Sequence, residues 1–474
     1  MSIFFKALFT ALLILTLFVI DPLGIRVSAE KHYEDHILRL LSPFFSDTVS
    51  DEVTVILLDE AFLEQTNTFP VSYTNLARLL KVINQHSPDA VFFDILQHHE
   101  HSERLGRWLK ALDRAKSPVF MASDPEYDTP ARLSHSDSLR QKIAAVSSLA
   151  AVSWSGEKHY YPMQVESQDR STPSVAHAMY ETYCEKPSII CEHNDAPGNL
   201  SSSMIVQWSN TFDPRQNRYL YVGESCLHQP DSAIGSMFDT LWSLLTQGLR
   251  SEQELDDRLR KQCPPLLTLS ATSLFAPGAS KSPELKEALE GKMVLVGYHL
   301  GGGLDTVLSP VHGKLPGVFN HAMALENLIL KGGEYWHVPE NIGVYNLSIA
   351  DIIEISIQIT VLFTVIWYRY SHLESGQAHS NPISGIWPVL LIGGLILASV
   401  LLSHLSLDLG VANWYALPLI LMLDLPIFLY FLLESLKKRL QTINQRALRS
   451  SRVRLRLAKR KVKQKHTIIF KEAK

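Results

Sequence analysis

Three aspartates lie where strand-like apolar segments end, and they are the residues best placed to bind a ligand. They are Asp59, Asp94 and Asp305. In an open parallel sheet, ligands bind beyond the carboxyl ends of the strands, so we expect these acids to converge at one edge of a domain. The turn before the third acid supplies backbone amides to the same edge through Gly301, Gly302 and Gly303.

Carboxylates beside backbone amides suit a divalent cation, or a cationic or hydroxylated ligand. The alternative is that each aspartate caps a following helix or holds a turn. The glycine turn does not predict phosphate binding, because it lacks the Walker lysine and the dinucleotide spacing and has acids nearby. We expect no cofactor.

A histidine-rich segment is the other group with ligand-type side chains. His98-His99-Glu100-His101 has the composition of a metal site, but its spacing is not that of a helical zinc motif, so a solvated loop is expected. A G-x-S-x-G elbow is missing, and no cysteine has a suitable His–Asn pair. The sequence therefore gives no indication of an enzyme.

The cysteines are confined to the middle of the chain. They are Cys184, Cys191, Cys226 and Cys263. An even number in one region is compatible with two disulfides in an oxidising compartment. Close spacing favours pairing Cys184 with Cys191, which leaves Cys226 for Cys263. Connectivity stays open at this point, and four buried thiols are the alternative.

Alternating strand and helix patterns predict an α/β domain. Val53–Asp59, Ala90–Asp94 and Pro118–Ala122 are continuous apolar runs, which is the pattern of parallel strands covered on both faces. Helical patterns separate them, so βαβ units and a mostly parallel sheet are expected. The strand Lys292–Gly297 and the helix Gly317–Leu330 close the domain. The polar, serine-rich residues 155–260 are expected to be an insertion with its own loops.

Four apolar segments are candidates for membrane-spanning helices, which need about 20 apolar residues. They are Phe4–Ile20, Ile349–Trp367, Ile386–Leu405 and Val411–Leu433. The basic residues that follow place the C-terminus in the cytoplasm and the large central region outside it. We favour an uncleaved anchor for the first segment, and a signal peptide ending near Val27-Ser28-Ala29 is the alternative. The expected domains are an anchor (1–20), an extracytoplasmic domain (21–345), three spans (346–434) and a tail (435–474).

The net charge of −4 conceals a strong asymmetry. Residues 435–474 hold 15 Lys and Arg and one acid, whereas the rest holds 29 basic and 47 acidic residues, a net of −18. Leu433, Leu436, Leu440 and Ile443 recur at helical spacing, which would suit a homodimer. The tail is expected to lie on anionic lipid or to bind a cytoplasmic protein. It lacks aromatic residues among the basic ones, so nucleic acid is not an expected partner.

Several of these segments together resemble a CHASE2 domain, the extracytoplasmic sensory module of bacterial membrane receptors. The resemblance covers roughly residues 30–335 and departs from the family at Val71-Ser72-Tyr73, where an arginine is usual. The segments that carry it are Leu58-Asp59, Phe69-Pro70, Phe93-Asp94, Val119-Phe120, Gly291–Gly297, Asp305, Pro310, Pro316-Gly317-Val318 and His321-Ala322.

The resemblance implies a sensor in the inner membrane of a bacterium. About 40 residues follow the last predicted span, too few for a kinase or cyclase, so we expect a relay to a separate cytoplasmic partner. The ligand would be a small molecule or ion outside the cytoplasm. The alternative is a structural or assembly subunit of an envelope complex, with the soluble domain as a docking platform.

Overall fold

The structure is a computed structural model of the 474-residue chain. It describes residues 51–134, 138–154, 160–167, 170–187, 200–210, 213–219, 264–300 and 305–337, with short pieces and single positions elsewhere. The chain divides into two compact units. One comprises residues 1–30, 341–407 and 414–474, and the other comprises residues 31–340 and 408–413. In the first unit, the short strands β13 (Asn341–Ile342) and β14 (Leu347–Ser348) form an antiparallel pair.

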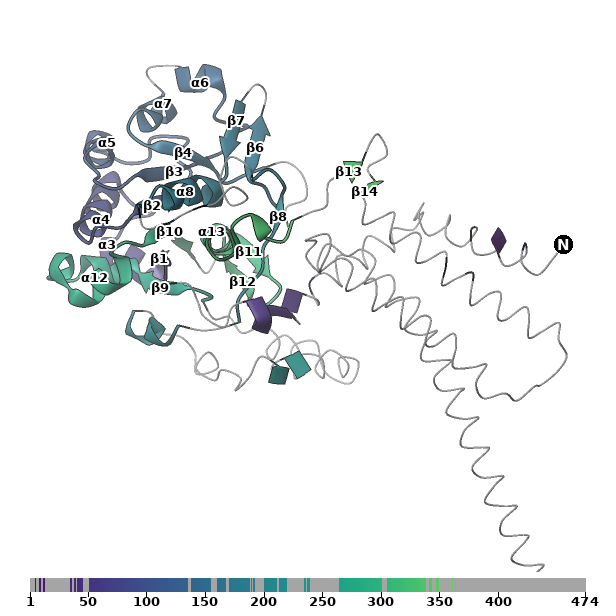
Figure 1. The fold of residues 1–474 in the computed structure, drawn as a ribbon. Helices are drawn as coiled ribbons and strands as arrows, with labels where there is room; N and C mark the ends of the chain where they lie inside the picture. The colour runs from purple at the N-terminus through teal and green to yellow at the C-terminus, as the bar shows by residue number, and fades with distance from the viewer. Residues whose placement is uncertain are drawn as a thin grey trace, which may run out of the picture. The chain divides into compact units, whose positions relative to one another are not determined.

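A six-stranded parallel sheet forms the centre of the second unit (Figure 1). Its spatial order is β4-β3-β2-β10-β1-β9. Strand β10, the last of these six in the sequence, is thus inserted between β1 and β2, the first two. Because every neighbouring pair is parallel, all the carboxyl ends lie at one edge. The strands are β1 (Val53–Asp59), β2 (Ala90–Asp94), β3 (Val119–Ser123), β4 (Ser148–Ala151), β9 (Leu267–Ser270) and β10 (Met293–His299).

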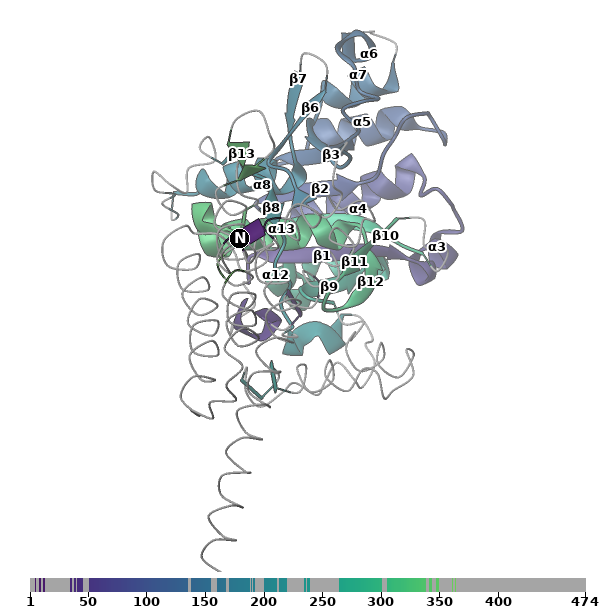
Figure 2. The ribbon, with the colours of Figure 1, turned by 90° about the vertical axis from the view of Figure 1, so that its right-hand side faces the viewer.

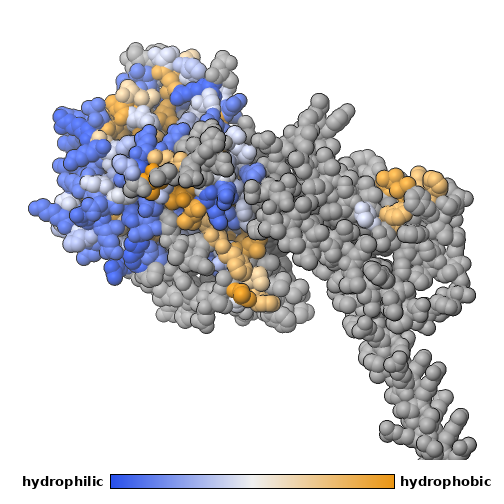
Figure 3. Space-filling model, in the orientation of Figure 1, coloured by the Kyte–Doolittle hydropathy of each residue, from blue (hydrophilic) through white to orange (hydrophobic). Residues whose placement is uncertain are grey.

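One face of this sheet is covered by the helices that connect consecutive strands. The connections from β1 to β2, β2 to β3, β3 to β4 and β9 to β10 step along the sheet in the same direction, so right-handed crossovers place their helices on one face. The connection from β4 to β9 runs in the opposite direction and carries α8 on the other face. The described surface of this layer, over α4, α5 and α12, is largely hydrophilic (Figure 3). The helices are α3 (Glu60–Thr66), α4 (Tyr73–Gln85), α5 (Leu105–Asp113), α6 (Pro130–Ser134), α7 (Leu139–Ala144), α11 (Ala271–Phe275) and α12 (Pro283–Leu289), with the 3-10 turn η5 (Ala279–Lys281).

The opposite face carries α8 (Val175–Cys184) and α13 (Val318–Lys331), which pack against each other. Both lie in front of the strands in Figure 2. Short hairpins and turns surround them. These are β5 (Tyr160–Tyr161) with β8 (Met204–Ile205), β6 (Gln164–Ser167) with β7 (Arg170–Pro173), β11 (Thr306–Ser309) with β12 (Gly313–Pro316), and the 3-10 turns η2 (Pro214–Arg218) and η6 (Gly332–Glu334).

Two hydrophobic cores result from the alternation of side chains along the strands. In β1, Val55 and Leu57 point into the core under α8 and α13, whereas Ile56 and Leu58 point into the core under α4. All four are fully or almost fully buried. Burial on both faces is what the continuous apolar runs predicted, and the mostly parallel α/β sheet is confirmed.

The serine-rich region holds more regular structure than the sequence predicted. Helix α8 lies within it and was expected to be loop. Strands β4 and β9, which lie before and after this region in the sequence, were not predicted either. Helix α8 is buried on most of its circumference, including His177 and Tyr180, so it lacks the polar face that marks a surface helix. This helix is therefore one of the two that cover a face of the sheet, instead of part of a peripheral insertion.

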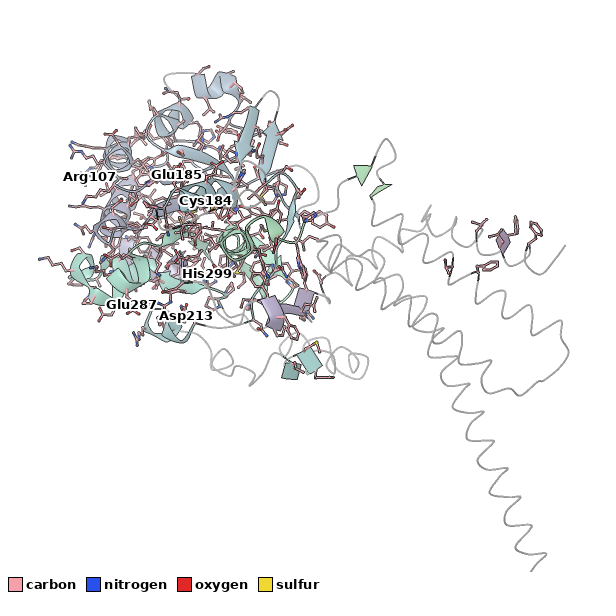
Figure 4. All side chains as sticks on the ribbon, in the orientation of Figure 1. Arg107, Cys184, Glu185, Asp213, Glu287 and His299 are labelled. Atoms are coloured by element: carbon pink, nitrogen blue, oxygen red, sulfur yellow. A yellow bond between two sulfur atoms is a disulfide. The ribbon has the colours of Figure 1, made fainter. Side chains whose placement is uncertain are left out.

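A disulfide and an ion-pair cluster fasten the end of α8 to the amino edge of the sheet. Cys184, labelled in Figure 4, is bonded to Cys191, as the close spacing favoured. Between them, Lys186 Nζ lies 2.5 Å from Asp89 and 3.0 Å from Glu52. Burial opposes the charge of Lys186, but the hydrogen bonds to these two carboxylates raise its pKa. Cys226 and Cys263 lie outside the described residues.

Among the described helices, none has both the length and the apolar character needed to cross a bilayer. The four predicted spans, Phe4–Ile20, Ile349–Trp367, Ile386–Leu405 and Val411–Leu433, lie outside the described residues apart from single positions, and so does the basic tail.

Candidate functional site

The carboxyl edge of the sheet gathers polar side chains from strands that are far apart in sequence. Gly297 of β10 lies beside Asp94 of β2, and His299 lies beside Asp59 of β1. His299 is labelled at the end of β10 in Figure 4. Strand β10 lies between β1 and β2, so Asp59 and Asp94 lie on opposite sides of it, each one strand away.

Asp59 is engaged by its own helix. Its carboxylate accepts a hydrogen bond of 2.9 Å from the backbone N–H of Phe62 and caps α3. This is the capping alternative for an aspartate at a strand end. The same strand end thus starts the helix, and the ligand role of Asp59 stays a prediction.

Asp94 and Asp305 are brought together, although 211 residues of sequence separate them. Burial raises the pKa of Asp94 well above its ordinary value, and the charge of Asp305 raises it further. Burial also raises the pKa of Asp305. Within the described part of the chain, neither carboxylate has a hydrogen-bond partner, and both keep some exposure to solvent. Two acidic side chains from distant parts of the sequence therefore lie at the same accessible edge of the sheet.

A close backbone approach fixes the position of Asp305. The backbone N–H of Gly317 donates to the Asp305 carbonyl at 3.1 Å. A Cβ on Gly317 would lie 2.9 Å from Asp305 Cγ and closer still to Oδ1. Only glycine leaves room for this carboxylate, and it does so at the N-terminus of α13. The carboxylate does not cap that helix, because it makes no hydrogen bond to its first amides.

A second glycine sets α13 against the sheet. A Cβ on Gly297 would lie 2.5 Å from Val318 Cβ, so the first turn of α13 packs directly on β10. The two glycines, Gly297 and Gly317, therefore let the start of α13 lie close to the ends of β10 and β2.

A buried Tyr–His pair joins β5 to α13. The Tyr161 hydroxyl accepts from the Ala176 N–H at 3.0 Å and lies 2.8 Å from His321 Nδ1. Burial lowers the pKa of His321 to about 3, which keeps the ring neutral. Burial raises the pKa of Tyr161, and the charge of Asp94 adds to the effect.

A second polar cluster lies beyond β3. Arg140 forms a bidentate pair with Asp128, with Nε–Oδ1 at 2.8 Å and Nη2–Oδ2 at 2.6 Å, and both residues are buried. Ser123, the last residue of β3, donates to Asp128 at 2.7 Å. Burial and the charge of Arg140 lower the pKa of His98 nearby. This cluster ties α7 to the end of β3, and we assign it a structural role.

The predicted histidine-rich segment forms a loop, as expected. Gly301, Gly302 and Gly303 lie outside the described residues, so their place at the edge stays a prediction. In the part of the chain that the structure describes, no group of three or more His, Cys, Asp or Glu side chains is arranged to hold a metal ion.

Sequence reasoning missed Tyr161, His321 and the Arg140–Asp128 pair. The motif containing His321 was visible, but nothing in the sequence placed it next to a tyrosine 160 positions earlier. Gly297 and Gly317 stood in the most distinctive segments, and their lack of a Cβ was the available signal for a close approach.

An open parallel α/β sheet with free carboxylates at its carboxyl edge has the architecture of a ligand-binding domain. The CHASE2 domain model matches residues 9–350, which is most of the chain. The protein therefore belongs to the CHASE2 family, a family of sensory domains. No curated protein and no solved structure matches the chain with significant similarity.

Proposed function

We propose that this protein is a membrane-bound sensor whose CHASE2 domain lies outside the cytoplasm and binds a small molecule or ion at the Asp94–Asp305 pair. One observation carries the proposal: two adjacent carboxylates at an accessible sheet edge have raised pKa values and no hydrogen-bond partner among the described residues. Like charges held together in a fold are costly unless a ligand offsets them, and such groups cluster at functional sites.

Helix α13 is the element that can report ligand binding. Gly317, at its N-terminus, lies against the carboxylate of Asp305. Its Asn327 amide pairs with the backbone of Gln207, with bonds of 3.1 and 2.9 Å. After the helix, Tyr335 donates to the Ser202 carbonyl and Trp336 accepts from the Ile205 N–H, just before the chain enters the other unit. A shift of α13 would thus reach the segments predicted to cross the membrane.

The signal would pass through those segments to the basic tail and then to a separate cytoplasmic protein. The proposal includes no catalytic step in this chain. A homodimer would let two α13 helices act on one bundle of membrane helices.

A docking role is the second candidate, favoured by exposed apolar side chains near the same edge. Phe69 packs edge-on against Tyr298 at the end of β10 and is 62% exposed, and Leu96 after β2 is 42% exposed. A partner protein that covered these side chains would make the domain a platform in an envelope assembly.

Crosslinking in cells separates the two candidates. The full chain, a version ending at Lys438, and the full chain with Asp94→Asn and Asp305→Asn would be captured and their partners identified by mass spectrometry. A cytoplasmic signalling protein captured by the full chain only, with a yield that changes in the double variant, supports the sensor. Envelope proteins captured equally by all three, and lost in Phe69→Ser, support the docking role and contradict the sensor.

Labelling of introduced cysteines tests the topology. A cysteine in the exposed α5 helix, at Arg107 (Figure 4), should react with an impermeant maleimide in intact cells with a permeabilised outer membrane, and one at Lys474 should not. The reverse pattern would contradict the proposed orientation.

A further inference from the structure

Exposed apolar side chains lie in two loops at the carboxyl edge of the sheet. Phe69, in the loop between α3 and α4, is 62% exposed, and Leu96, in the loop after β2, is 42% exposed. The Phe69 ring rests edge-on against Tyr298 at the end of β10, with ring centroids 6.0 Å apart. The rest of the ring faces outward, so both side chains are available to a partner.

Hydrogen bonds join these two loops and the end of β10 into one surface. His101 Nε2 donates to the Val71 carbonyl at 3.0 Å, which ties the loop after β2 to the loop before α4. The Val71 N–H donates to the Tyr298 hydroxyl at 3.2 Å, which ties the same loop to β10. Phe69 and Leu96 therefore belong to one fixed surface, and apolar groups exposed together in this way are typical of a protein-binding surface.

The same two connections are strongly acidic. Residues 59–72 and 94–104 contain six Asp and Glu and one Arg, a net charge of −5 with neutral histidines. Glu64, Glu100 and Glu103 are exposed and form no ion pair with any residue that the structure describes. Negative charge that the domain does not balance thus surrounds the apolar side chains.

Acids at the opposite edge of the sheet are neutralised within the domain. Lys186 pairs with Glu52 and Asp89, and Lys292 pairs with Asp51. The domain therefore balances charge where its strands begin and leaves negative charge where they end. Complementary charge steers and selects a partner, so this surface fits a partner with positive charge.

We propose that this surface docks a basic segment of another protein, in which Lys or Arg side chains flank apolar ones. The apolar side chains cover Phe69 and Leu96, and the cations lie at Glu64, Glu100 and Glu103. A polyamine would supply the charge without the apolar group, and a neutral apolar segment would leave the acids unmatched. This inference rests on the docking candidate above and names the chemistry of its partner.

The test uses short peptides and the full chain in nanodiscs of zwitterionic lipid, with empty nanodiscs as the baseline. Calorimetry compares Lys-Leu-Lys-Lys-Leu-Lys with its Ser-for-Leu counterpart, its Glu-for-Lys counterpart and spermidine. The Lys–Leu peptide should bind roughly tenfold more tightly than the Lys–Ser peptide, because burial of one large apolar side chain contributes about that factor. The Glu–Leu peptide should not bind, and binding of the Lys–Leu peptide should weaken as salt is added.

Variants assign the two halves of the peptide to their residues. Phe69→Ser should weaken binding of the Lys–Leu peptide by roughly tenfold and leave the Lys–Ser peptide unchanged. Glu100→Gln with Glu103→Gln should weaken both peptides by roughly fourfold, because each exposed ion pair contributes a factor of about two. The matched control is Asp113→Asn with Glu290→Gln, the same charge change at exposed positions beside the amino edge, and it should bind like the parent chain.

Each other outcome overturns the inference. Equally tight binding of the Lys–Leu peptide, the Lys–Ser peptide and spermidine would mean that only negative charge attracts them, and binding of the Glu–Leu peptide would make charge irrelevant. No binding of any peptide to the folded chain would reject the partner class. Binding that is lost in Asp94→Asn with Asp305→Asn, but kept in Phe69→Ser, would place the peptide at the proposed ligand site instead. If envelope proteins are captured in cells while no peptide binds, the docking candidate survives and only the chemistry assigned to its partner fails.

Discussion

The contact between Gly297 and Val318 gives the sharpest test of how α13 is positioned. Alanine at 297 would place its Cβ 2.5 Å from Val318 Cβ and 2.8 Å from Cγ1, whereas carbon atoms in contact are about 3.5–4.0 Å apart. The first turn of α13 would have to move outward by roughly 1 Å to restore that separation. Overpacking of this kind costs about 1–3 kcal/mol, so Gly297→Ala should lower the free energy of unfolding by that amount.

The choice of rescue variant follows from which atom is closest. Val318→Ala keeps the Cβ that makes the clash, so it should not rescue Gly297→Ala. Val318→Gly removes that atom. On its own, it should cost about 3 kcal/mol, from three buried carbons at about 0.8 kcal/mol each and the low helix propensity of glycine.

A double-mutant cycle measures the clash directly. In the Val318→Gly background, Gly297→Ala should cost nothing, so the coupling energy should equal the cost of the single variant, about 1–3 kcal/mol. In the Val318→Ala background the coupling should be near zero. Urea unfolding of the full chain, followed by tryptophan fluorescence, supplies the values. If Val318→Ala rescued as well as Val318→Gly, or if Gly297→Ala were neutral, the close packing of α13 on β10 would be refuted.

Three further predictions concern charge and crosslinking. Folding raises the pKa of Asp94, so its charged form destabilises the fold above the raised pKa, and the penalty disappears as the pH falls through that value toward 3.8. Asp94→Asn should thus be more stable than the parent at neutral pH, and the difference should shrink on acidification in thermal unfolding; a constant difference would argue against the buried pair. Arg140→Met leaves the Asp128 carboxylate buried without its bidentate partner and should cost about 3–5 kcal/mol in urea unfolding, most of it recovered by adding Asp128→Leu. A cost under about 1 kcal/mol would mean that Asp128 finds another partner. Replacing Cys184 and Cys191 by serine should cost about 2.5 kcal/mol, the loop-closure entropy for a separation of 7 residues, and the same loss should follow from reductant in the parent but not in the variant.

Strands β1, β2, β3 and β10 were predictable because their burial is encoded locally. Val53–Asp59 and Ala90–Asp94 were predicted to the residue, since a run buried on both faces has no polar interruption. The insertion of β10 between β1 and β2 was not predictable, because strand order depends on packing between segments far apart in sequence. That insertion decides which acids meet, because it carries Gly297 to the side of Asp94.

The site was predictable only in part for a related reason. Position after a strand selected all three acids, but it could not separate a capping side chain from a free one. Asp59 is followed at once by α3 and bonds to Phe62, whereas Asp94 is followed by a loop and has no helix to cap. Tyr161 and His321, which pair in the core beside α13, come from two segments that only the tertiary fold brings together.

The acid pair also limits how large a signal the domain can generate. A ligand can shift an equilibrium only by the difference in its binding free energy between two conformations. In the proposed mechanism, that difference comes from the repulsion between Asp94 and Asp305, which is large when the first turn of α13 holds them together and small when it moves away. The free domain would then favour the separated arrangement, and a cationic ligand would favour the close one.

Asp305→Asn removes the repulsion without changing the shape of the side chain, so it should hold α13 in the close arrangement without ligand. If the chain signals through α13, this variant should be constitutively in the bound-like state, whereas a variant that merely lost ligand binding would resemble the free state. Hydrogen exchange of the α13 amides, compared between the parent and Asp305→Asn, distinguishes the two: greater protection in the variant supports the repulsion as the source of the signal, and unchanged protection excludes it.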